Sequence, residues 1–222
     1  MLAILAPMAL ELQPVLAKLP NLTPLPAGPV RSYTGTLHGT PIVAATIGIG
    51  KVRAAISTQA ILDRFAPKAV LLTGTAGAVA PDAQPLEVVL ANRLAFYDLD
   101  PALIPLVARD YYPTDAALCH LAQSLSPDAK VGAIVTGDRF LSNAAEKAVL
   151  FSRFAARCAD MESAAVAQTC RRNRVPLAVI RCLSDRGDGT AKQDFQHHAV
   201  QAAERAATLV CRIAASLADE QS

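Results

Sequence analysis

Acidic residues stand next to apolar segments at several points of the chain, where they could serve general acid–base chemistry or bind a ligand. Glu11 and Asp185 each follow an apolar run, and Asp160 and Glu162 open an apolar helical stretch. Carboxyl groups exchange protons with a substrate when their surroundings adjust the pKa. Helix capping or a solvent-exposed helix face would explain each acid taken singly, because Asp and Glu favour helix N-termini.

An arginine and a loop of small residues extend this set of candidates. Arg181 lies inside the apolar run LAVIRCL, where a cation needs a partner or a cavity. The segment Thr73–Ala78 follows another apolar run, and its small residues allow a ligand to approach the backbone closely. An ordinary tight turn would explain this loop alone. Together, the acids, the arginine and the loop predict a ligand site that lacks a phosphate-binding P-loop.

The sequence contains no recognisable metal or redox motif. Its five cysteines lack CxxC spacing, and most lie in apolar stretches, which favours buried thiols in a reducing cytoplasm. Among the four histidines only His197 and His198 are close in sequence, and adjacent residues of a helix point apart. We therefore expect neither a bound metal nor a cofactor.

Charge and hydropathy argue against two classes of partner. The net charge is only +2 and the basic residues are scattered, which disfavours nucleic-acid binding. No apolar run approaches the ~20 residues that a membrane-spanning helix needs. The N-terminal segment lacks the basic residues that open a signal peptide. We expect a cytoplasmic protein that binds neither nucleic acid nor membrane.

The elements that must position the candidate residues alternate along the chain. Six apolar runs are predicted to be strands: Leu2–Ala6, Pro41–Ile47, Ala69–Thr75, Glu87–Ala91, Val131–Thr136 and Leu177–Leu183. Three stretches are predicted to be helices: Lys51–Phe65, Met161–Arg172 and Phe195–Leu217. The 222 residues, 52% of them hydrophobic, suffice for a single domain over residues 1–222. This alternation predicts an α/β layered fold with a central, largely parallel (mixed) β-sheet flanked by helices.

The order of these segments resembles the purine nucleosidase and nucleoside phosphorylase superfamily, most closely the 5′-methylthioadenosine/S-adenosylhomocysteine nucleosidases. The matching stretches run in family order from residue 2 to about residue 215: Ile4–Glu11, GIGKV from Gly48, TGTAG from Thr73, TGDRF from Thr136, DMESA from Asp160 and RCLSD from Arg181. Their combination is specific, whereas each stretch alone would be a weak signal. The resemblance implies a phosphorylase/hydrolase-like fold.

The resemblance implies that Glu11 and Asp185 are the catalytic pair. Asp185 matches the general acid that protonates N7 of the purine as the N-glycosidic bond breaks. Glu11 matches the base that takes a proton from the attacking water. Arg181 and Thr75 match positions that help to hold this water, with Thr75 in place of the more usual Ser.

The resemblance also assigns the residues that bind the nucleoside. Glu162 matches the carboxylate that binds the ribose hydroxyls, and Phe140 matches the ring that stacks on the base. Leu141 matches the position whose backbone recognises the purine edge. The remaining matching positions line the ribose, the base or the pocket for the 5′ substituent: Met8, Ile49, Gly77, Met161, Ser184 and Phe195.

The resemblance therefore implies a hydrolase that releases adenine from 5′-methylthioadenosine and/or S-adenosylhomocysteine, with a role in methionine salvage. A nucleosidase for another 5′-modified purine nucleoside, such as futalosine, and a purine nucleoside phosphorylase are alternatives. Phosphorylases of this kind bind phosphate through arginines at two places where this chain has Leu72 and an arginine-free stretch from Ala6 to Lys18. Water is thus the expected nucleophile. A silent nucleoside-binding protein is disfavoured, because Glu11 and Asp185 are both present.

The family's dimer and the high hydrophobic content predict a homodimer. The segment Pro101–Pro113 is shorter than in the family and departs from its pattern, which leaves the identity of the 5′ group open. Because this segment helps to form the pocket for the 5′ substituent in relatives, often in the neighbouring subunit, we expect it to contact the partner. Its candidate contact residues are Ile104, Leu106, Tyr111 and Tyr112.

Overall fold

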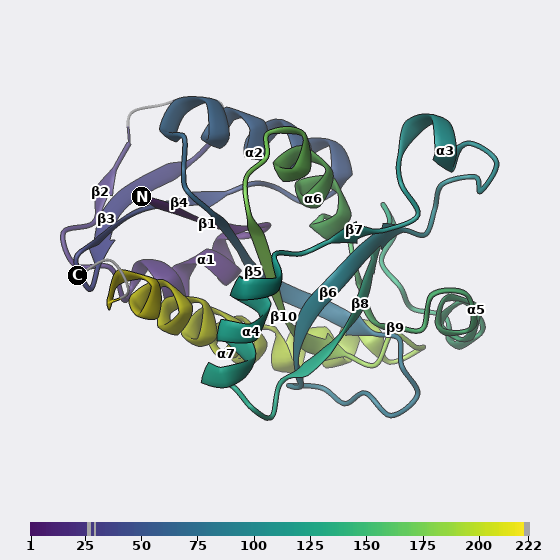
Figure 1. Cartoon of the computed structure of the whole chain (residues 1–222). Helices are drawn as coiled ribbons and strands as arrows, with labels where there is room; N and C mark the ends of the chain where they lie inside the picture. Colours follow the sequence, from purple (N-terminus) through teal and green to yellow (C-terminus); the bar gives the residue numbers. More distant parts are fainter. Residues whose placement is uncertain (26–27, 29, 220–222) are drawn as a thin grey trace.

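The computed structural model describes residues 1–25, 28 and 30–219 (Figure 1). Its strands are β1 (Leu2–Ala6), β2 (Thr23–Pro24), β3 (Ser32–Leu37), β4 (Thr40–Thr46), β5 (Val70–Ala78), β6 (Val88–Phe96), β7 (Tyr112–Pro113), β8 (Lys130–Thr136), β9 (Ala156–Asp160) and β10 (Leu177–Asp185). Its helices are α1 (Ala9–Leu16), α2 (Lys51–Phe65), α3 (Ile104–Val107), α4 (Ala116–Leu125), α5 (Ala144–Phe154), α6 (Ser163–Arg172) and α7 (Ala191–Asp219).

Strand pairing closes part of the sheet into a ring. The strand order is β10-β6-β8-β9-β5-β1-β4-β3-β2, and β5 also pairs with β10. The strands β10, β6, β8, β9 and β5 therefore form a closed, barrel-like ring, from which β1, β4, β3 and β2 extend as an open sheet. Closure removes the two unpaired edges that these strands would otherwise expose.

The expected α/β fold with a helix-flanked sheet is confirmed, but the sheet is mixed rather than largely parallel. Of the ten strand pairings among the described residues, five are parallel and five antiparallel. Antiparallel pairs join β9 to β5 and β10 to β6, the two seams that close the ring. Strands buried on both faces are apolar in either direction, so their composition does not report the pairing.

Helices on both faces of the sheet explain why β1 is apolar throughout. In β1, Ala3 and Leu5 belong to a core that includes residues of α2 and α6, whereas Leu2 and Ile4 belong to a core shared with α1 and α7. Successive side chains of a strand point to opposite faces, so both sets are buried. Figure 1 shows α2 and α6 together on one side of the sheet and α7 on the other.

The predicted strands and helices are all present, with small differences in their bounds. Leu2–Ala6 and Lys51–Phe65 coincide with β1 and α2. The strand β10 extends beyond the predicted run to Asp185, which pairs with Gly77 of β5 after an irregularity in the register. No prediction covers the remaining elements: β2, β3, β7, β9, α1, α3, α4 and α5.

The segment Pro101–Pro113 packs onto its own chain more closely than expected. Ile104 is 9% exposed and Tyr112 only 3%, and the Tyr112 ring meets Phe96 edge to face with centroids 6.0 Å apart. These two side chains are therefore not available to a partner subunit, which corrects that part of the expectation. Leu106, in contrast, is 80% exposed.

Candidate active site

A cavity of about 280 Å³ lies where several strands of the sheet end. Its walls come from the ends of β5, β9 and β10, from the segments after β1, β4, β8 and β9, and from the helices α1 and α7. All of the predicted site residues except Arg181 line it: Met8, Glu11, Ile49, Thr75, Gly77, Phe140, Leu141, Met161, Glu162, Ser184, Asp185 and Phe195. The topology thus brings together residues that are dispersed over most of the chain.

Glu11 lies in the first turn of α1 and is only 1% exposed. Its Oε1 accepts hydrogen bonds from the backbone N–H of Thr75 at 2.6 Å and from the Thr75 hydroxyl at 2.8 Å. Its Oε2 accepts one from the N–H of Met8 at 2.9 Å. Burial raises the pKa of Glu11, and the nearby Arg181 and these hydrogen bonds oppose the rise. Three donors therefore fix the orientation of the carboxylate.

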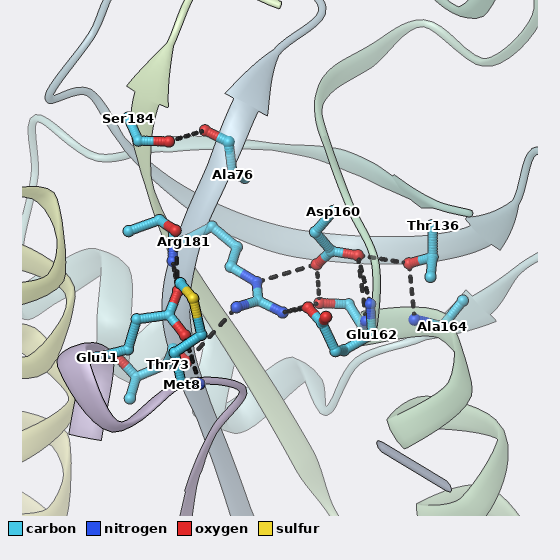
Figure 2. Close-up of polar contacts among 12 residues, drawn as sticks. Met8, Glu11, Thr73, Ala76, Thr136, Asp160, Glu162, Ala164, Arg181 and Ser184 are labelled. Carbon is cyan, nitrogen blue, oxygen red and sulfur yellow. Dashed lines mark hydrogen bonds and ion pairs between the residues drawn. The ribbon is translucent and has the colours of Figure 1, made fainter. Parts of the chain in front are cut away.

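Arg181 is fully buried in β10 and lies behind the cavity wall instead of lining it. Its Nε donates a hydrogen bond to Oδ2 of Asp160 at 2.9 Å. Its Nη2 donates to Oε2 of Glu162 at 3.3 Å and to the hydroxyl of Ser163 at 3.2 Å. Figure 2 shows the guanidinium facing the carboxyl groups of Asp160 and Glu162. The cation that the sequence predicted to need a partner has two.

Two glycines of β5 leave the space that these charged groups occupy. A Cβ atom on Gly74 would collide with Nη1 of Arg181 and lie 2.8 Å from Oε1 of Glu11. A Cβ atom on Gly77 would lie 2.9 Å from Oδ1 of Asp185. The glycines of the TGTAG stretch are thus required by side chains of the protein itself, in addition to any ligand.

Asp160 lies at the end of β9 and holds this cluster together; it is one of the candidate acids of the sequence, but the resemblance assigns it no role. Its Oδ1 accepts hydrogen bonds from the hydroxyl of Thr136 at 2.6 Å and from the N–H of Ser163 at 3.1 Å. Its Oδ2 accepts hydrogen bonds from Arg181 and from the Ser163 hydroxyl. The capping interpretation of Asp160 is thus correct in part, because Ser163 begins α6. The same carboxylate also lines the cavity and orients Arg181.

Glu162 is 4% exposed and connects the cluster to a second segment of the chain. Its Oε1 accepts a hydrogen bond from the N–H of Gly50 at 3.0 Å, while its Oε2 faces Arg181. Burial raises the pKa of Glu162 to about 7, with Arg181 opposing the rise and Asp160 adding to it. Near neutral pH its carboxyl group therefore populates both the protonated and the charged form.

Asp185 ends β10 and is also 1% exposed. Its Oδ1 accepts a hydrogen bond from the N–H of Gly187 at 2.9 Å, and its Oδ2 accepts one from the Ser184 hydroxyl at 2.8 Å. Burial raises the pKa of Asp185 to about 6; the two hydrogen bonds oppose the rise, and the acidic neighbours Asp194 and Asp188 add to it. Within the described residues, no ion pair reaches this carboxyl group.

Apolar side chains form much of the remaining wall. The rings of Phe140 and Phe195 meet edge to face with centroids 6.3 Å apart. Phe140 and Ile49 are 45% and 49% exposed, which places them at the mouth, whereas Leu141 is buried. A concave site with apolar walls and a few fixed polar groups is typical of small-molecule binding.

The sequence analysis missed several other residues that line the cavity: Pro7, Ala76, Arg139 and Ala159. Pro7, Ala76 and Arg139 are immediate neighbours of predicted residues within the matched stretches, whereas Ala159 lies just before the stretch that begins at Asp160. Arg139 forms an ion pair with Glu146 of α5. Over the described part of the chain, Arg139 is the only basic residue in the cavity wall.

Across residues 1–25, 28 and 30–219, no group of three or more His, Cys, Asp or Glu side chains is arranged to hold a metal ion. In the same part of the chain, no helix has both the length and the hydropathy to cross a membrane. The cysteines are free thiols.

Comparisons with known proteins identify the family of the chain. The model of the phosphorylase superfamily matches residues 1–215. A 5′-methylthioadenosine/S-adenosylhomocysteine nucleosidase of Staphylococcus aureus is 30% identical over 207 residues, which are 88% of this chain and 91% of that protein. The chain belongs to the 5′-methylthioadenosine/S-adenosylhomocysteine nucleosidase family of the phosphorylase superfamily.

Solved structures of the superfamily have the same fold. The family enzyme of Neisseria meningitidis, in complex with methylthio-immucillin-A, is 30% identical, with a TM-score of 0.91 over 97% of this chain and 98% of that one. The futalosine hydrolase of Helicobacter pylori is 26% identical, also with a TM-score of 0.91, over 97% of each chain. The fold is thus shared with a 5′-methylthioadenosine/S-adenosylhomocysteine nucleosidase and with a futalosine hydrolase.

Proposed function

We propose that the protein is a nucleosidase that hydrolyses the N-glycosidic bond of 5′-methylthioadenosine and/or S-adenosylhomocysteine, releasing adenine and the 5′-modified ribose. One observation carries the proposal: two buried carboxyl groups, Glu11 and Asp185, reach one cavity from different elements, and their neighbours differ in charge. The relatives named above support the substrate class.

In this proposal Asp185 is the general acid. A purine anion is a poor leaving group, so N7 must receive a proton as the glycosidic bond breaks. A pKa of about 6 leaves a fraction of Asp185 protonated near neutral pH, which an exposed Asp would not retain. The Ser184 hydroxyl and the Gly187 N–H fix the direction in which the carboxyl group points.

Glu11 is the proposed base that takes a proton from the attacking water. Its carboxylate is held by Met8 and Thr75, and a water at the cavity wall can approach it there. Arg181 does not line the cavity, so its proposed part is that of a positioning residue. It stabilises the charged forms of Glu11, Asp160 and Glu162 from behind.

The remaining site residues bind the nucleoside in this proposal. Glu162 accepts hydrogen bonds from the ribose hydroxyls, and together with Glu11 it opposes the positive charge that develops on the ribosyl group. Phe140 stacks on the base, and the backbone of Leu141 recognises the purine edge. The other lining residues surround the ribose, the base or the apolar 5′ substituent: Met8, Ile49, Gly77, Met161, Ser184 and Phe195.

The cavity wall favours water over phosphate as the nucleophile. Phosphate recognition uses arginine side chains that form paired hydrogen bonds. Leu72 is fully buried, and Arg181 is enclosed by Asp160 and Glu162. Arg139 is on the segment that bears Phe140 and is paired with Glu146. In the described cavity wall no arginine remains beside Glu11 to hold a phosphate.

The decisive experiment is an assay of purine release from a panel of nucleosides, with and without inorganic phosphate. The panel contains 5′-methylthioadenosine, S-adenosylhomocysteine, futalosine and unmodified adenosine. We expect adenine release from the first two at a rate that does not depend on phosphate, with the free 5-modified ribose as the second product. A ribose 1-phosphate product, or strict dependence on phosphate, would assign the protein to the phosphorylases instead.

A futalosine nucleosidase is the second candidate, favoured by the H. pylori futalosine hydrolase, which covers the chain as fully as the family enzyme of N. meningitidis does. The open mouth of the cavity at Ile49 and Phe140 would admit a large 5′ group. Hypoxanthine release from futalosine at a kcat/KM above that for 5′-methylthioadenosine would select this candidate.

The same proposal describes a cytoplasmic homodimer in which residues 1–222 form one nucleosidase domain. Large apolar side chains are exposed near the mouth of the cavity: Val52 is 67% and Ile56 62% exposed, one turn apart on α2, and Ile49 lines the cavity itself. Leu106 adds an exposed apolar residue on α3. Burial against a second copy would cover these residues and shield the site from water.

Light scattering at micromolar concentration tests the dimer. We expect the wild type to be a dimer, and Val52→Asp to be a monomer with a raised KM for nucleosides that carry a 5′ substituent. The exposed Val149, which is 62% exposed on α5, provides the matched control, because Val149→Asp should leave the dimer intact. A fully active wild-type monomer would refute the shared pocket.

A further inference from the structure

Three charged residues form a cluster at the rim of the cavity, outside its wall. Nζ of Lys51 donates hydrogen bonds to both carboxylate oxygens of Asp98, at 2.8 and 2.7 Å, and lies 3.5 Å from Oδ2 of Asp138. Asp98 also accepts a hydrogen bond from the backbone N–H of Asp138 at 3.0 Å. The side chains of Lys51 and Asp98 are about one-fifth exposed, and that of Asp138 is 47% exposed. This cluster joins the start of α2 to the segments that follow β6 and β8.

The start of α2 connects the same cluster to the carboxylate proposed to bind the ribose. The N–H of Gly50 donates to Glu162 at 3.0 Å, and the next N–H, that of Lys51, donates to Oδ1 of Asp138 at 2.8 Å. Adjacent peptide groups therefore hold two carboxylates on different sides of the cavity rim. Because these two N–H groups are adjacent, they link the position of the segment that contains Asp138 to the position of Glu162.

A second contact holds the segment after β8 from the side of β6. The hydroxyl of Tyr97 donates to the carbonyl of Arg139 at 3.2 Å, and the Tyr97 N–H donates to the carbonyl of Thr136 at 3.0 Å. The Tyr97 ring fills the space that a Cβ atom on Gly137 would need. Tyr97 and Asp98 thus hold residues 136–139 in place through hydrogen bonds. The next two residues, Phe140 and Leu141, line the cavity.

We propose that Asp98 is a positioning residue for purine binding: through Lys51 and Asp138 it fixes the segment that contains Phe140 and Leu141 relative to Glu162. This inference rests on the proposed function, which assigns the base to Phe140 and Leu141. Asp98 does not touch the cavity and acts only through other residues. Without the cluster, the ligand itself would have to order the segment that contains Phe140 and Leu141. The loss of conformational entropy would then weaken binding of the base.

The test compares ligands that contain the base with one that lacks it. Asp98→Asn keeps the size of the side chain and an acceptor for the Asp138 N–H, but it removes the ion pair with Lys51. We expect the dissociation constant for free adenine, measured by calorimetry, and the KM for 5′-methylthioadenosine to rise about tenfold each. The affinity for 5-methylthioribose and kcat should change by less than about threefold, because Glu11, Glu162 and Asp185 stay in place.

Two further variants separate positioning from a general loss of stability. Lys51→Met should reproduce the weakened adenine binding, and the double variant with Asp98→Asn should be no weaker than either single one. Asp82→Asn is the matched control, because it removes another two-oxygen contact, with Arg157 at 2.9 and 2.8 Å, that lies away from the cavity. This control should leave adenine binding unchanged. Asp98→Glu, which retains the charge, should restore most of the affinity.

Several results would overturn the inference. Adenine affinity within twofold of the wild type in both Asp98→Asn and Lys51→Met would do so, as would an equal loss for adenine and 5-methylthioribose. Because adenine binding is measured without catalysis, a wild type that binds adenine but cleaves no nucleoside would refute the proposed function and leave the inference intact. A wild type that binds neither adenine nor hypoxanthine would refute the inference as well.

Discussion

Two walls of one cavity hold equally buried carboxyl groups in opposite electrostatic surroundings. Glu11 receives three hydrogen bonds and faces the guanidinium of Arg181, and all of these favour its charged form. Asp185 receives two hydrogen bonds and has Asp194 and Asp188 as its charged neighbours, which favour its neutral form. Each is 1% exposed, so exposure does not distinguish them. The two carboxyl groups differ in the charges of their neighbours.

The comparison explains how one residue type can serve as a base and as an acid in the same reaction. Burial raises the pKa of both groups. On the Glu11 side a buried cation limits this rise, whereas on the Asp185 side two acids reinforce it. Substitutions that remove the neighbours, and not the carboxyl groups themselves, therefore test whether the assignment of roles is correct.

The largest effect is expected from Arg181→Met, which removes the buried cation that lies beside Glu11, Asp160 and Glu162. Asp160, Glu162 and Glu11 would then be buried without a counter-charge, which typically costs about 3–5 kcal/mol. Urea denaturation should show a fall of this size in the free energy of unfolding. Arg157→Met is the control, because Arg157 pairs with Asp82 and Glu87 at a more exposed site.

Loss of an exposed pair such as that of Arg157 with Asp82 typically costs about 1 kcal/mol or less. Equal destabilisation by the two substitutions would show that Arg181 is not needed as a counter-charge for the buried carboxylates of Glu11, Asp160 and Glu162. A stable Arg181→Met protein with normal turnover would contradict the positioning role proposed for Arg181.

Asp185→Asn should have the next largest effect, on turnover. Without a proton donor for the purine, kcat should fall at least about a hundredfold, since general acid catalysis typically contributes this much or more. The fold and the affinity for 5′-methylthioadenosine should remain, because the Oδ1 of Asn can accept from the Gly187 N–H while its NH2 donates to the Ser184 hydroxyl. Adenine release and calorimetric binding measure the two quantities. Turnover within tenfold of the wild type would remove Asp185 as the acid.

The fold could be predicted in outline because strand and helix patterns are local. The alternation of apolar runs located β1 and α2 residue for residue. The direction of β6, β8 and β9 relative to β5 and β10 is set by which strands pair across the closed ring. That depends on long-range packing, which no local pattern encodes. The strand β9, with Arg157 beside Cys158, also lacks the apolar pattern of a buried strand.

The site could be predicted where its residues belong to the matched stretches, and less well where several side chains interact. Arg181 was recognised as a buried cation, but its burial behind the wall follows from its contacts with Asp160 and Glu162. Asp160 was a candidate without an assigned role, because a strand-end acid before a helix has the ordinary explanation of a cap. The links between Lys51, Asp98 and Asp138 cross between distant segments and have no local signature.

A smaller effect is expected from Thr75→Val, which removes one of the hydrogen bonds that Glu11 accepts. Loss of the hydroxyl at 2.8 Å destabilises the charged carboxylate, so the pKa of Glu11 rises. The acidic limb of the kcat/KM profile should move to higher pH by about one unit, since a hydrogen bond to a charged group contributes about 1.5–3 kcal/mol. Thr75→Ser retains the donor and should leave this limb in place. Movement of the alkaline limb instead would reverse the two assignments.

The smallest effect is expected from Asp194→Asn, which changes the charges near Asp185. Asp194 raises the pKa of Asp185, and it also pairs with Arg186 at 3.3 Å, so its neutralisation removes an anion and frees a cation. Both changes favour the charged form of Asp185. Its pKa should fall, and the alkaline limb of kcat/KM should move to lower pH by about half a unit or less, because the pair is partly exposed to solvent.

The opposite substitution in the Asp194–Arg186 pair reverses the expected sign. Arg186→Gln removes the cation and leaves Asp194 unpaired, so the alkaline limb should move to higher pH. Asp63→Asn changes the net charge by the same amount as Asp194→Asn at an exposed site on α2, and it should move neither limb. If Asp194→Asn and Arg186→Gln shift the limb in the same direction, the charges around Asp185 do not set its pKa. The contrast between the two walls would then rest on Arg181 alone.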